Sequence, residues 1–196
     1  GEAGIGEKGR GLGLVNFEEL RRGNLGLFFV TVHSRLASMG KRFPGVRTQD
    51  HAFARCIGEL AYYRRMEAKG VLRQIRDRPT LDTHLEAWES DSDSCPLGFV
   101  LTMEGADGIV DDAQVGDWWE EGLRVVSLCH YGISAYSHGT QAPGGLTPRG
   151  GPLLRALERA GIILDVSHLA EAAFWEALDG FGGQVLGTHN CCRALC

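Results

Sequence analysis

"IILDVSHLAEAAFWEALDGFGGQVLGTHN", residues 162–190, contains two apolar runs that each end at a histidine, His168 and His189. The segment between the two runs has apolar residues at helical spacing. A strand, a helix and a second strand in this order are typical of a parallel βαβ unit, because parallel strands need a long crossover connection. The stretch therefore predicts an α/β fold in which two successive strands end on imidazole groups.

The same alternation of strands and helices is present in much of the chain. Continuous apolar strands indicate burial on both faces, which a parallel sheet covered by helices provides. Because the strand–helix units recur at barrel spacing, we expect an α/β fold of the (β/α)8 TIM-barrel type. The expected strands are 25–32, 97–104, 123–130, 162–168 and 183–189, and the expected helices are 16–24, 51–77, 111–122, 150–161 and 169–181, with a short helix or turn and a polar loop over 78–96.

Composition excludes several classes of ligand. The 196 residues are 43% hydrophobic, which is enough to bury one core, and carry a net charge of -5 with no long basic run. We therefore expect no nucleic-acid partner, and no apolar stretch approaches the ~20 residues of a membrane span. Six cysteines without CxxC spacing favour reduced thiols and a cytoplasmic protein.

The glycine-rich start of the chain resembles a phosphate-binding motif only formally. Gly4, Gly6 and Gly9 form a GxGxxG pattern. No strand precedes this pattern and no apolar helix follows it, as a dinucleotide-binding turn would require. We therefore interpret residues 1–15 as a flexible leader and residues 16–196 as the domain.

Residues of the types that bind metals end four of the expected strands, namely Glu104, His130, His168 and His189. The carboxyl ends of parallel barrel strands meet on one face, so these side chains are expected to converge. A single strand-end histidine is more often a hydrogen-bonded core residue, but the joint pattern favours a metal site. Neutral imidazole and carboxylate suit zinc, and a metal-activated water suits hydrolysis.

Four segments carry a family resemblance. A Gly-Leu-Thr-Pro turn at 145–148, an Asp-Val-Ser-His strand end at 165–168 and a Thr-His-Asn strand end at 188–190 occur in this order. The chain resembles the membrane dipeptidase (renal dipeptidase) family of zinc metallopeptidases, a branch of the amidohydrolase-like barrels. The resemblance is strong over 96–196 and weaker over 17–78, and its segments are "FVLTMEGADGI", "LRVVSLCHYGISAYS", "GGLTPRGGPLLRALERAGIILDVSHLAEAAFWEAL" and "VLGTHNCCRALC".

The resemblance implies a role for each strand-end residue. Glu104 would bridge two zinc ions, His168 and His189 would complete the second zinc site, and His130 would stabilise the tetrahedral oxyanion as a hydrogen-bond donor. The implied reaction is hydrolysis of the amide bond of a dipeptide, with tolerance for a D-residue on the carboxyl-terminal side. The family also suggests a homodimer.

Several features of the family are absent from this sequence. No His-x-Asp pair supplies the first zinc, and neither the later arginine that binds the substrate carboxylate nor the last-strand aspartate follows. We therefore expect a fragment that forms an incomplete barrel without its first and last strands, in which only the second zinc site is fully encoded. If these residues are the whole protein, we expect peptidase activity to be weak or nil. The alternatives are a catalytically inactive barrel relative that acts as a binding or assembly module, and a lactone or cyclic amide hydrolase.

The remaining histidines are secondary candidates. His33 follows an expected strand and His138 lies in the loop after His130, so both are candidates for substrate-side contacts. His51 lies on an expected helix and His84 in a polar turn. We expect both of these to be surface residues.

Other polar residues near the strand ends have weaker claims. Asp107 is expected either to orient a ligand or to be a solvated loop carboxylate, and Asp165 to face a helix or cap one. Adjacent thiols cannot easily reach one ion together, so Cys191 and Cys192 are not expected to be ligands. Three tryptophans on expected helices are interpreted as packing against the outside of the sheet: Trp118, Trp119 and Trp175.

Overall fold

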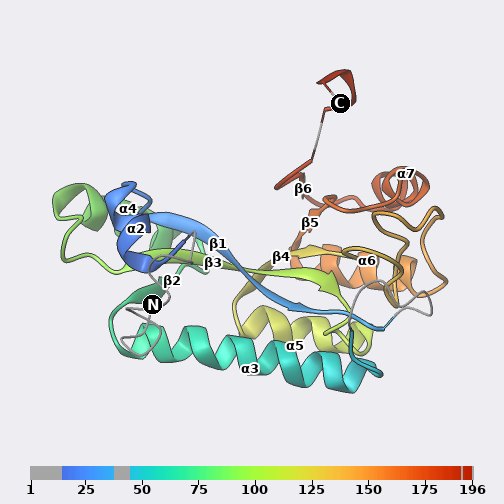
Figure 1. Ribbon diagram of the computed structural model, residues 1–196, viewed down its shortest axis with the longest axis horizontal. Helices are drawn as coiled ribbons and strands as arrows, with labels where there is room; N and C mark the ends of the chain where they lie inside the picture. The colour runs from blue at the N-terminus through green and yellow to red at the C-terminus, as the bar shows by residue number, and fades with distance from the viewer. Residues whose placement is uncertain (1–14, 38–44, 191, 196) are drawn as a thin grey trace. The chain divides into compact units, whose positions relative to one another are not determined.

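The computed structural model describes residues 15–37, 45–190 and 192–195. The glycine-rich motif and nearly all of the expected leader lie outside these residues. The chain divides into two compact units, Gly1–Phe29 with Tyr63–Val100, and Val30–Tyr62 with Leu101–Cys196. Two strands, β1 (Leu27–Ser34) and β3 (Leu97–Ala106), and helix α3 (Gln49–Ala68) belong partly to each unit (Figure 1).

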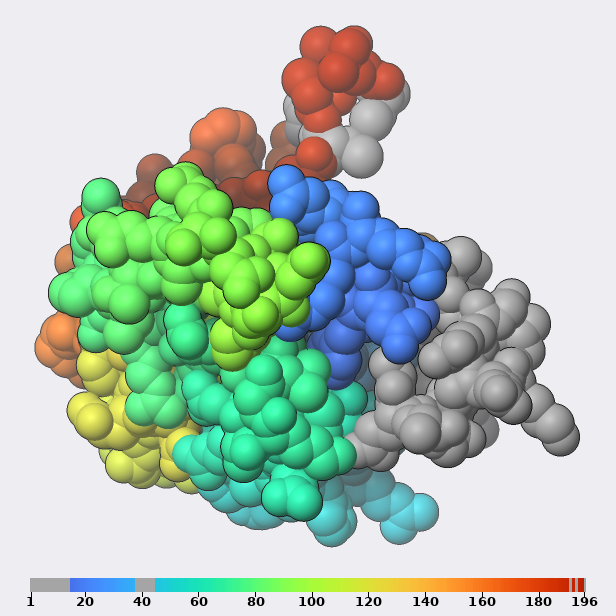
Figure 2. Space-filling model, turned by 90° about the vertical axis from the view of Figure 1, so that its left-hand side faces the viewer, coloured from blue at the N-terminus to red at the C-terminus, as the bar shows by residue number. Residues whose placement is uncertain are grey.

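The first unit contains α2 (Phe17–Arg22), β2 (Leu72–Gln74) and α4 (Arg78–Ser90). The side chain of Arg21 donates hydrogen bonds to the carbonyl oxygens of Ser92 and Cys95, both at 2.9 Å. These bonds hold α2 against the loop that follows α4, and the two segments lie side by side on the face shown in Figure 2.

The expected helix 51–77 is wrong in its last part. Helix α3 ends at Ala68, and Gly70 has a φ of 70°, a left-handed conformation that commonly ends helices. The chain then forms β2, which pairs in parallel with β3 in the register Leu72↔Leu97. Leu72, which continued the apolar spacing of the helix, is thus buried as part of a short strand.

The expectation that His84 is a surface residue is also wrong. Helix α4 begins with a capping box between Asp77 and Thr80, and its His84 is 0% exposed. The Nε2 atom of His84 lies 2.8 Å from the carbonyl oxygen of Gly26. The imidazole occupies the space that a Cβ on Gly98 would need, so glycine at position 98 makes the close approach of α4 to the strand feasible.

The second unit confirms the expected α/β class. Parallel pairing joins β3 to β4 (Leu123–Ser127), β4 to β5 (Ile163–Asp165) and β5 to β6 (Val185–Leu186), and β1 lies on the other side of β3. The connections carry η1 (Asp112–Gln114), α5 (Val115–Glu120), α6 (Gly150–Ala160) and α7 (Glu171–Gly180), and η2 (Arg193–Leu195) follows β6.

Helices α3 and α5 lie side by side in this unit, where the rings of Phe53 and Trp118 meet edge to face at 5.9 Å (Figure 1). Trp118 is buried, and Trp119 stacks under the guanidinium of Arg124 at 3.6 Å. Trp175 is 57% exposed, so the expectation that it packs against the sheet is wrong. Helix α7 buries its small residues Ala173 and Ala177 instead, which turns the indole to solvent.

Two further observations concern cysteines and membrane spans. The four cysteines among the described residues, Cys56, Cys95, Cys129 and Cys192, are free. In the described part of the chain, no helix combines the length and the apolar character needed to cross a bilayer.

Substitution of Gly98 by alanine is expected to destabilise the protein by about 1–3 kcal/mol, because the added methyl group overpacks the contact with His84. Urea unfolding of the purified protein measures this change. Gly58→Ala is the matched control: Gly58 lies within α3, and a Cβ there meets nothing within 4 Å. This control should raise stability by about 0.5–1 kcal/mol, and equal losses in both variants would contradict the assignment.

Candidate metal centre

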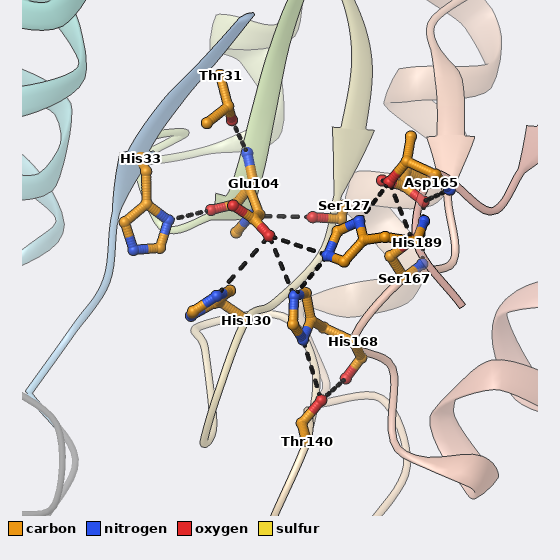
Figure 3. A network of polar contacts seen from close by, with 12 residues as sticks. Thr31, His33, Glu104, Ser127, His130, Thr140, Asp165, Ser167, His168 and His189 are labelled. Carbon is orange, nitrogen blue, oxygen red and sulfur yellow. Dashed lines mark hydrogen bonds and ion pairs between the residues drawn. The ribbon is translucent and has the colours of Figure 1, made fainter. Parts of the chain in front are cut away.

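The structure brings together the four strand-end residues that the sequence singled out. Glu104 lies on β3, whereas His130, His168 and His189 follow β4, β5 and β6 (Figure 3). The Oε1 atom of Glu104 lies 3.7 Å from the Nε2 of His130, 3.1 Å from that of His168 and 3.3 Å from that of His189. All four side chains belong to the second unit.

Three of these groups have the arrangement of a metal-binding site. The Nε2 atoms of His168 and His189 are 2.8 Å apart, and each lies 3.1–3.3 Å from the Oε1 of Glu104. Ligand atoms around a tetrahedral zinc ion are about 3.3 Å apart, given bonds of about 2.0–2.1 Å. One carboxylate and two imidazoles are also a common donor set for divalent ions, so these residues fit a metal.

Hydrogen bonds from neighbouring strands fix the backbone of Glu104. Its N–H donates to the Oγ1 of Thr31 at 2.9 Å, and its carbonyl oxygen lies 2.6 Å from the Nδ1 of His33. The next N–H, that of Gly105, donates to the Oγ of Ser127 at 3.1 Å. Strand β3 is therefore tied to β1 and β4 at the point where the carboxylate leaves the sheet.

A hydroxyl group orients the ring of His168. The Oγ1 of Thr140 lies 3.1 Å from the Nδ1 of His168 and donates its proton to the carbonyl oxygen of His168 at 3.3 Å. The hydroxyl then accepts from Nδ1–H, which leaves the Nε2 lone pair directed at Glu104. His168 has a φ of 68°, and such strained backbone is concentrated at functional sites.

A carboxylate acting through a hydroxyl orients the ring of His189. The Oγ1 of Thr188 donates to the Oδ2 of Asp165 at 2.6 Å and lies 2.7 Å from the Nδ1 of His189. Because the hydroxyl proton goes to Asp165, Nδ1–H donates to Thr188, and Nε2 keeps its lone pair for a metal. Asp165, 6% exposed, also accepts from the N–H groups of Ser167 and Thr188. The expected helix-facing or capping role of Asp165 is therefore wrong.

Burial keeps the imidazoles of His130 and His168 neutral. Burial lowers the pKa of His130 to about 4, and only the nearby Glu104 works against this shift. Burial is also the main cause of a lowered pKa for His168. At neutral pH both rings are thus uncharged, which is the form that binds metals or donates one hydrogen bond.

His33 and His138 differ in whether they contact the site. The ring of His33 lies 4.9 Å from that of His130, and its backbone N–H donates to Glu59 at 2.6 Å, so it borders the site. His138 instead contacts the carbonyl oxygen of Gly145 through Nδ1 at 2.8 Å, within its own loop. A substrate-side contact stays a prediction for both. His51 is exposed, as expected.

Asp107 matches neither role expected for it. It is 1% exposed and accepts hydrogen bonds from the N–H groups of Leu36 at 2.9 Å and Ala135 at 2.8 Å. Burial raises the pKa of its carboxyl. Asp107 therefore ties the segment after β1 to the loop after β4, a long-range role for which the sequence carries no local signal.

Neither of the two thiols near the site that the structure describes belongs to the group formed by Glu104, His168 and His189. Cys192 is exposed, and Cys191 lies outside the described residues, so the absence of a ligand role for both stays a prediction. Cys129 is buried, and its Sγ contacts the carbonyl oxygens of His138 at 3.4 Å and His168 at 3.6 Å. Burial raises the pKa of this thiol to about 12.

The fold and the carboxylate–imidazole cluster together define an α/β protein in which side chains that can hold a metal ion meet at the carboxyl ends of parallel strands. The family model for membrane dipeptidase, peptidase family M19, matches residues 7–196. The chain belongs to this family.

Individual relatives agree with this assignment. The chain is 27% identical to dipeptidase aclJ of Aspergillus oryzae over 190 residues, which cover 94% of this chain and 43% of that protein. The probable dipeptidase PvdM of Pseudomonas aeruginosa has a similar fold, with a TM-score of 0.75, 18% identity, and coverage of 93% of this chain and 47% of that one.

A metallo peptidase from Rhodobacter sphaeroides, solved with a phosphinate mimic of the dipeptide L-Ala-D-Ala, has a TM-score of 0.73 and 22% identity over 95% of this chain and 58% of that one. The chain thus spans about half the length of these proteins, and the expected incomplete (β/α)8 barrel type agrees with their fold.

Replacing Thr188 by valine is expected to weaken divalent-metal binding by about 10–100-fold, because His189 loses the acceptor that fixes its Nδ1–H. Competition with a chromogenic chelator measures the affinity. Thr188→Ser keeps the hydroxyl and should keep most of the affinity. Equal affinity in the valine and serine variants would show that the hydroxyl does not orient the ligand.

Proposed function

We propose that the protein is a zinc-dependent dipeptidase that hydrolyses the amide bond of dipeptides. The observation that carries this proposal is the convergence of Glu104, His168 and His189 on one point at the strand ends. Membership of the membrane dipeptidase family supports the reaction class. The structure of the Rhodobacter relative with a dipeptide mimic supports a dipeptide substrate, including one with a D-residue at the carboxyl-terminal position.

Glu104, His168 and His189 would hold the ion. With zinc held by these residues, the site would gain a hydroxide source at neutral pH and a Lewis acid for the scissile carbonyl. The hydroxyls of Thr140 and Thr188 keep the ligand rings in the tautomer that presents Nε2. Binding of a second ion by Glu104, formation of a homodimer and a cytoplasmic location are further parts of this proposal.

His130 has a different task in this mechanism. Its neutral ring lies at the edge of the metal-binding group, with Nε2 3.7 Å from Glu104. A proton on that nitrogen can be donated to the oxyanion that forms when hydroxide attacks the carbonyl carbon. The alternatives are a catalytically inactive relative, which the absence of a His-x-Asp pair from this sequence would favour, and a lactone or cyclic amide hydrolase.

Alanine at His168 or His189 is expected to remove about one equivalent of zinc and nearly all turnover of L-Ala-D-Ala, because each removes one ligand. Elemental analysis and an assay of released alanine measure the two effects. His51→Ala is the matched control, since His51 is exposed and its ring and backbone N–H contact the hydroxyl of Thr48, outside the metal-binding group. Full turnover in the zinc-free variants, or turnover of lactones but not of dipeptides, would contradict the proposal.

His130→Ala is expected to keep zinc but to lower kcat by about 100–1,000-fold, as for the loss of one oxyanion donor. Zinc content and steady-state kinetics measured on the same preparation separate the two effects. If the substitution empties the metal site, His130 is a ligand and its proposed role is wrong.

A further inference from the structure

The imidazoles of the site differ in the groups that face their Nδ1 atoms. The Nδ1 atoms of His168 and His189 face threonine hydroxyls whose protons go to other acceptors, and the Nδ1 of His33 faces a carbonyl oxygen. Each of these three nitrogens must therefore carry the hydrogen. The Nδ1 of His130 instead lies 3.4 Å from the Nη1 of Arg35.

This difference determines which nitrogen of His130 carries the proton. A guanidinium group has five N–H donors and no acceptor, so the Nδ1 of His130 must be the acceptor. The proton of the neutral ring then resides on Nε2, the atom that faces Glu104. An Nε2 that carries a proton has no lone pair for a metal but can donate a hydrogen bond.

We propose that Arg35 is a positioning residue that holds His130 in the Nε2–H tautomer, and thereby makes His130 a donor to the substrate rather than a metal ligand. The distances agree, because the Nε2 of His130 is 3.7 Å from Glu104, whereas those of the two ligands are 3.1 and 3.3 Å away. This inference rests on the proposed dipeptidase function. It adds Arg35 as the residue that makes His130 a hydrogen-bond donor, in contrast to the metal-ligating imidazoles.

The backbone around Arg35 is fixed by the fold. Arg35 follows β1 directly, and its carbonyl oxygen accepts from the N–H of Val46 at 2.9 Å. The next N–H, that of Leu36, donates to Asp107, which also holds Ala135 in the loop after His130. The buried carboxylate of Asp107 thus anchors both the segment that carries Arg35 and the loop that follows His130.

Aromatic contacts restrict rotation of the His130 ring. Its centroid lies 4.9 Å from that of His33, 4.6 Å from that of Tyr131 and 4.4 Å from that of His168. A ring flip that exchanged the two nitrogens would have to displace these neighbours. Among the described residues, Glu104 lies on the Nε2 side of the ring and Arg35 on the Nδ1 side, and a guanidinium beside Nδ1 leaves no acceptor there for a proton.

Nitrogen-15 NMR of the purified protein labelled at histidine tests the proposal directly, with His130→Gln to assign the signals. We expect the Nε2–H tautomer in the unsubstituted protein and in Arg35→Lys, since lysine is also only a donor. In Arg35→Glu the new carboxylate should accept from Nδ1–H and reverse the tautomer. An Nδ1–H tautomer in the unsubstituted protein, or no change in Arg35→Glu, would overturn the proposal.

Arg35→Met provides a second variant if the glutamate variant does not fold. It removes the donor without adding an acceptor, so the expected result is a mixture of tautomers. A pure Nε2–H signal in this variant would show that Arg35 does not select the tautomer. Thermal unfolding and zinc content are measured on every variant, and both should match the unsubstituted protein.

Kinetics then connect the tautomer to turnover. We expect Arg35→Glu to lower kcat on the order of a hundredfold with KM and zinc content unchanged, and Arg35→Lys to restore most of that loss. A reversed tautomer with unchanged kcat would overturn the link to the substrate. If the unsubstituted protein hydrolyses no dipeptide, the proposed function fails, while the NMR result still decides the role of Arg35.

Discussion

The partly buried carboxylate of Glu104 is the group on which the site depends. It leaves the sheet at the end of β3 and has three imidazole nitrogens within 3.7 Å of one oxygen. Because burial favours neutral rings at His130 and His168, these two imidazoles do not balance the charge of the carboxylate. A divalent cation between the carboxylate and the two ligand imidazoles would balance it, and the tight backbone bonding of Glu104 keeps this anion where the ligands converge.

The centre of the site could be predicted from the sequence because the topology of a parallel sheet determines where the strand ends lie. Parallel strands place their carboxyl ends together, so Glu104, His168 and His189 could be grouped before their distances were known. The groups that orient them could not be predicted in the same way. Thr140 reaches His168 from a loop 28 residues away, and Asp165 reaches His189 only through Thr188. No periodicity connects such residues, although hydroxyls beside strand-end histidines are a usable signal.

The errors in the fold have a common physical origin. Residues 72–74 continue the apolar spacing of α3, and only the pairing with β3 makes them a strand. His84 is buried because Gly98 leaves room for its ring and the carbonyl oxygen of Gly26 pairs with its Nε2. Trp175 is exposed because Ala173 and Ala177 occupy the buried side of α7. In each case a contact distant in the sequence decided the outcome. Where a pattern extends over many residues, as in α3 and β3, the type of element was predicted correctly, although the predicted end of α3 was wrong.

The buried thiol of Cys129 has a chemical consequence for a centre of this kind. Cysteine reacts with oxidants and binds soft metals mainly as a thiolate, and the raised pKa of Cys129 keeps it protonated in any physiological medium. Its hydrogen is engaged by the carbonyl oxygens of His138 and His168. The sulfur of Cys129 can therefore lie next to His130 in the chain without binding copper or forming sulfenic acid, and the described group that can bind an ion has only nitrogen and oxygen donors.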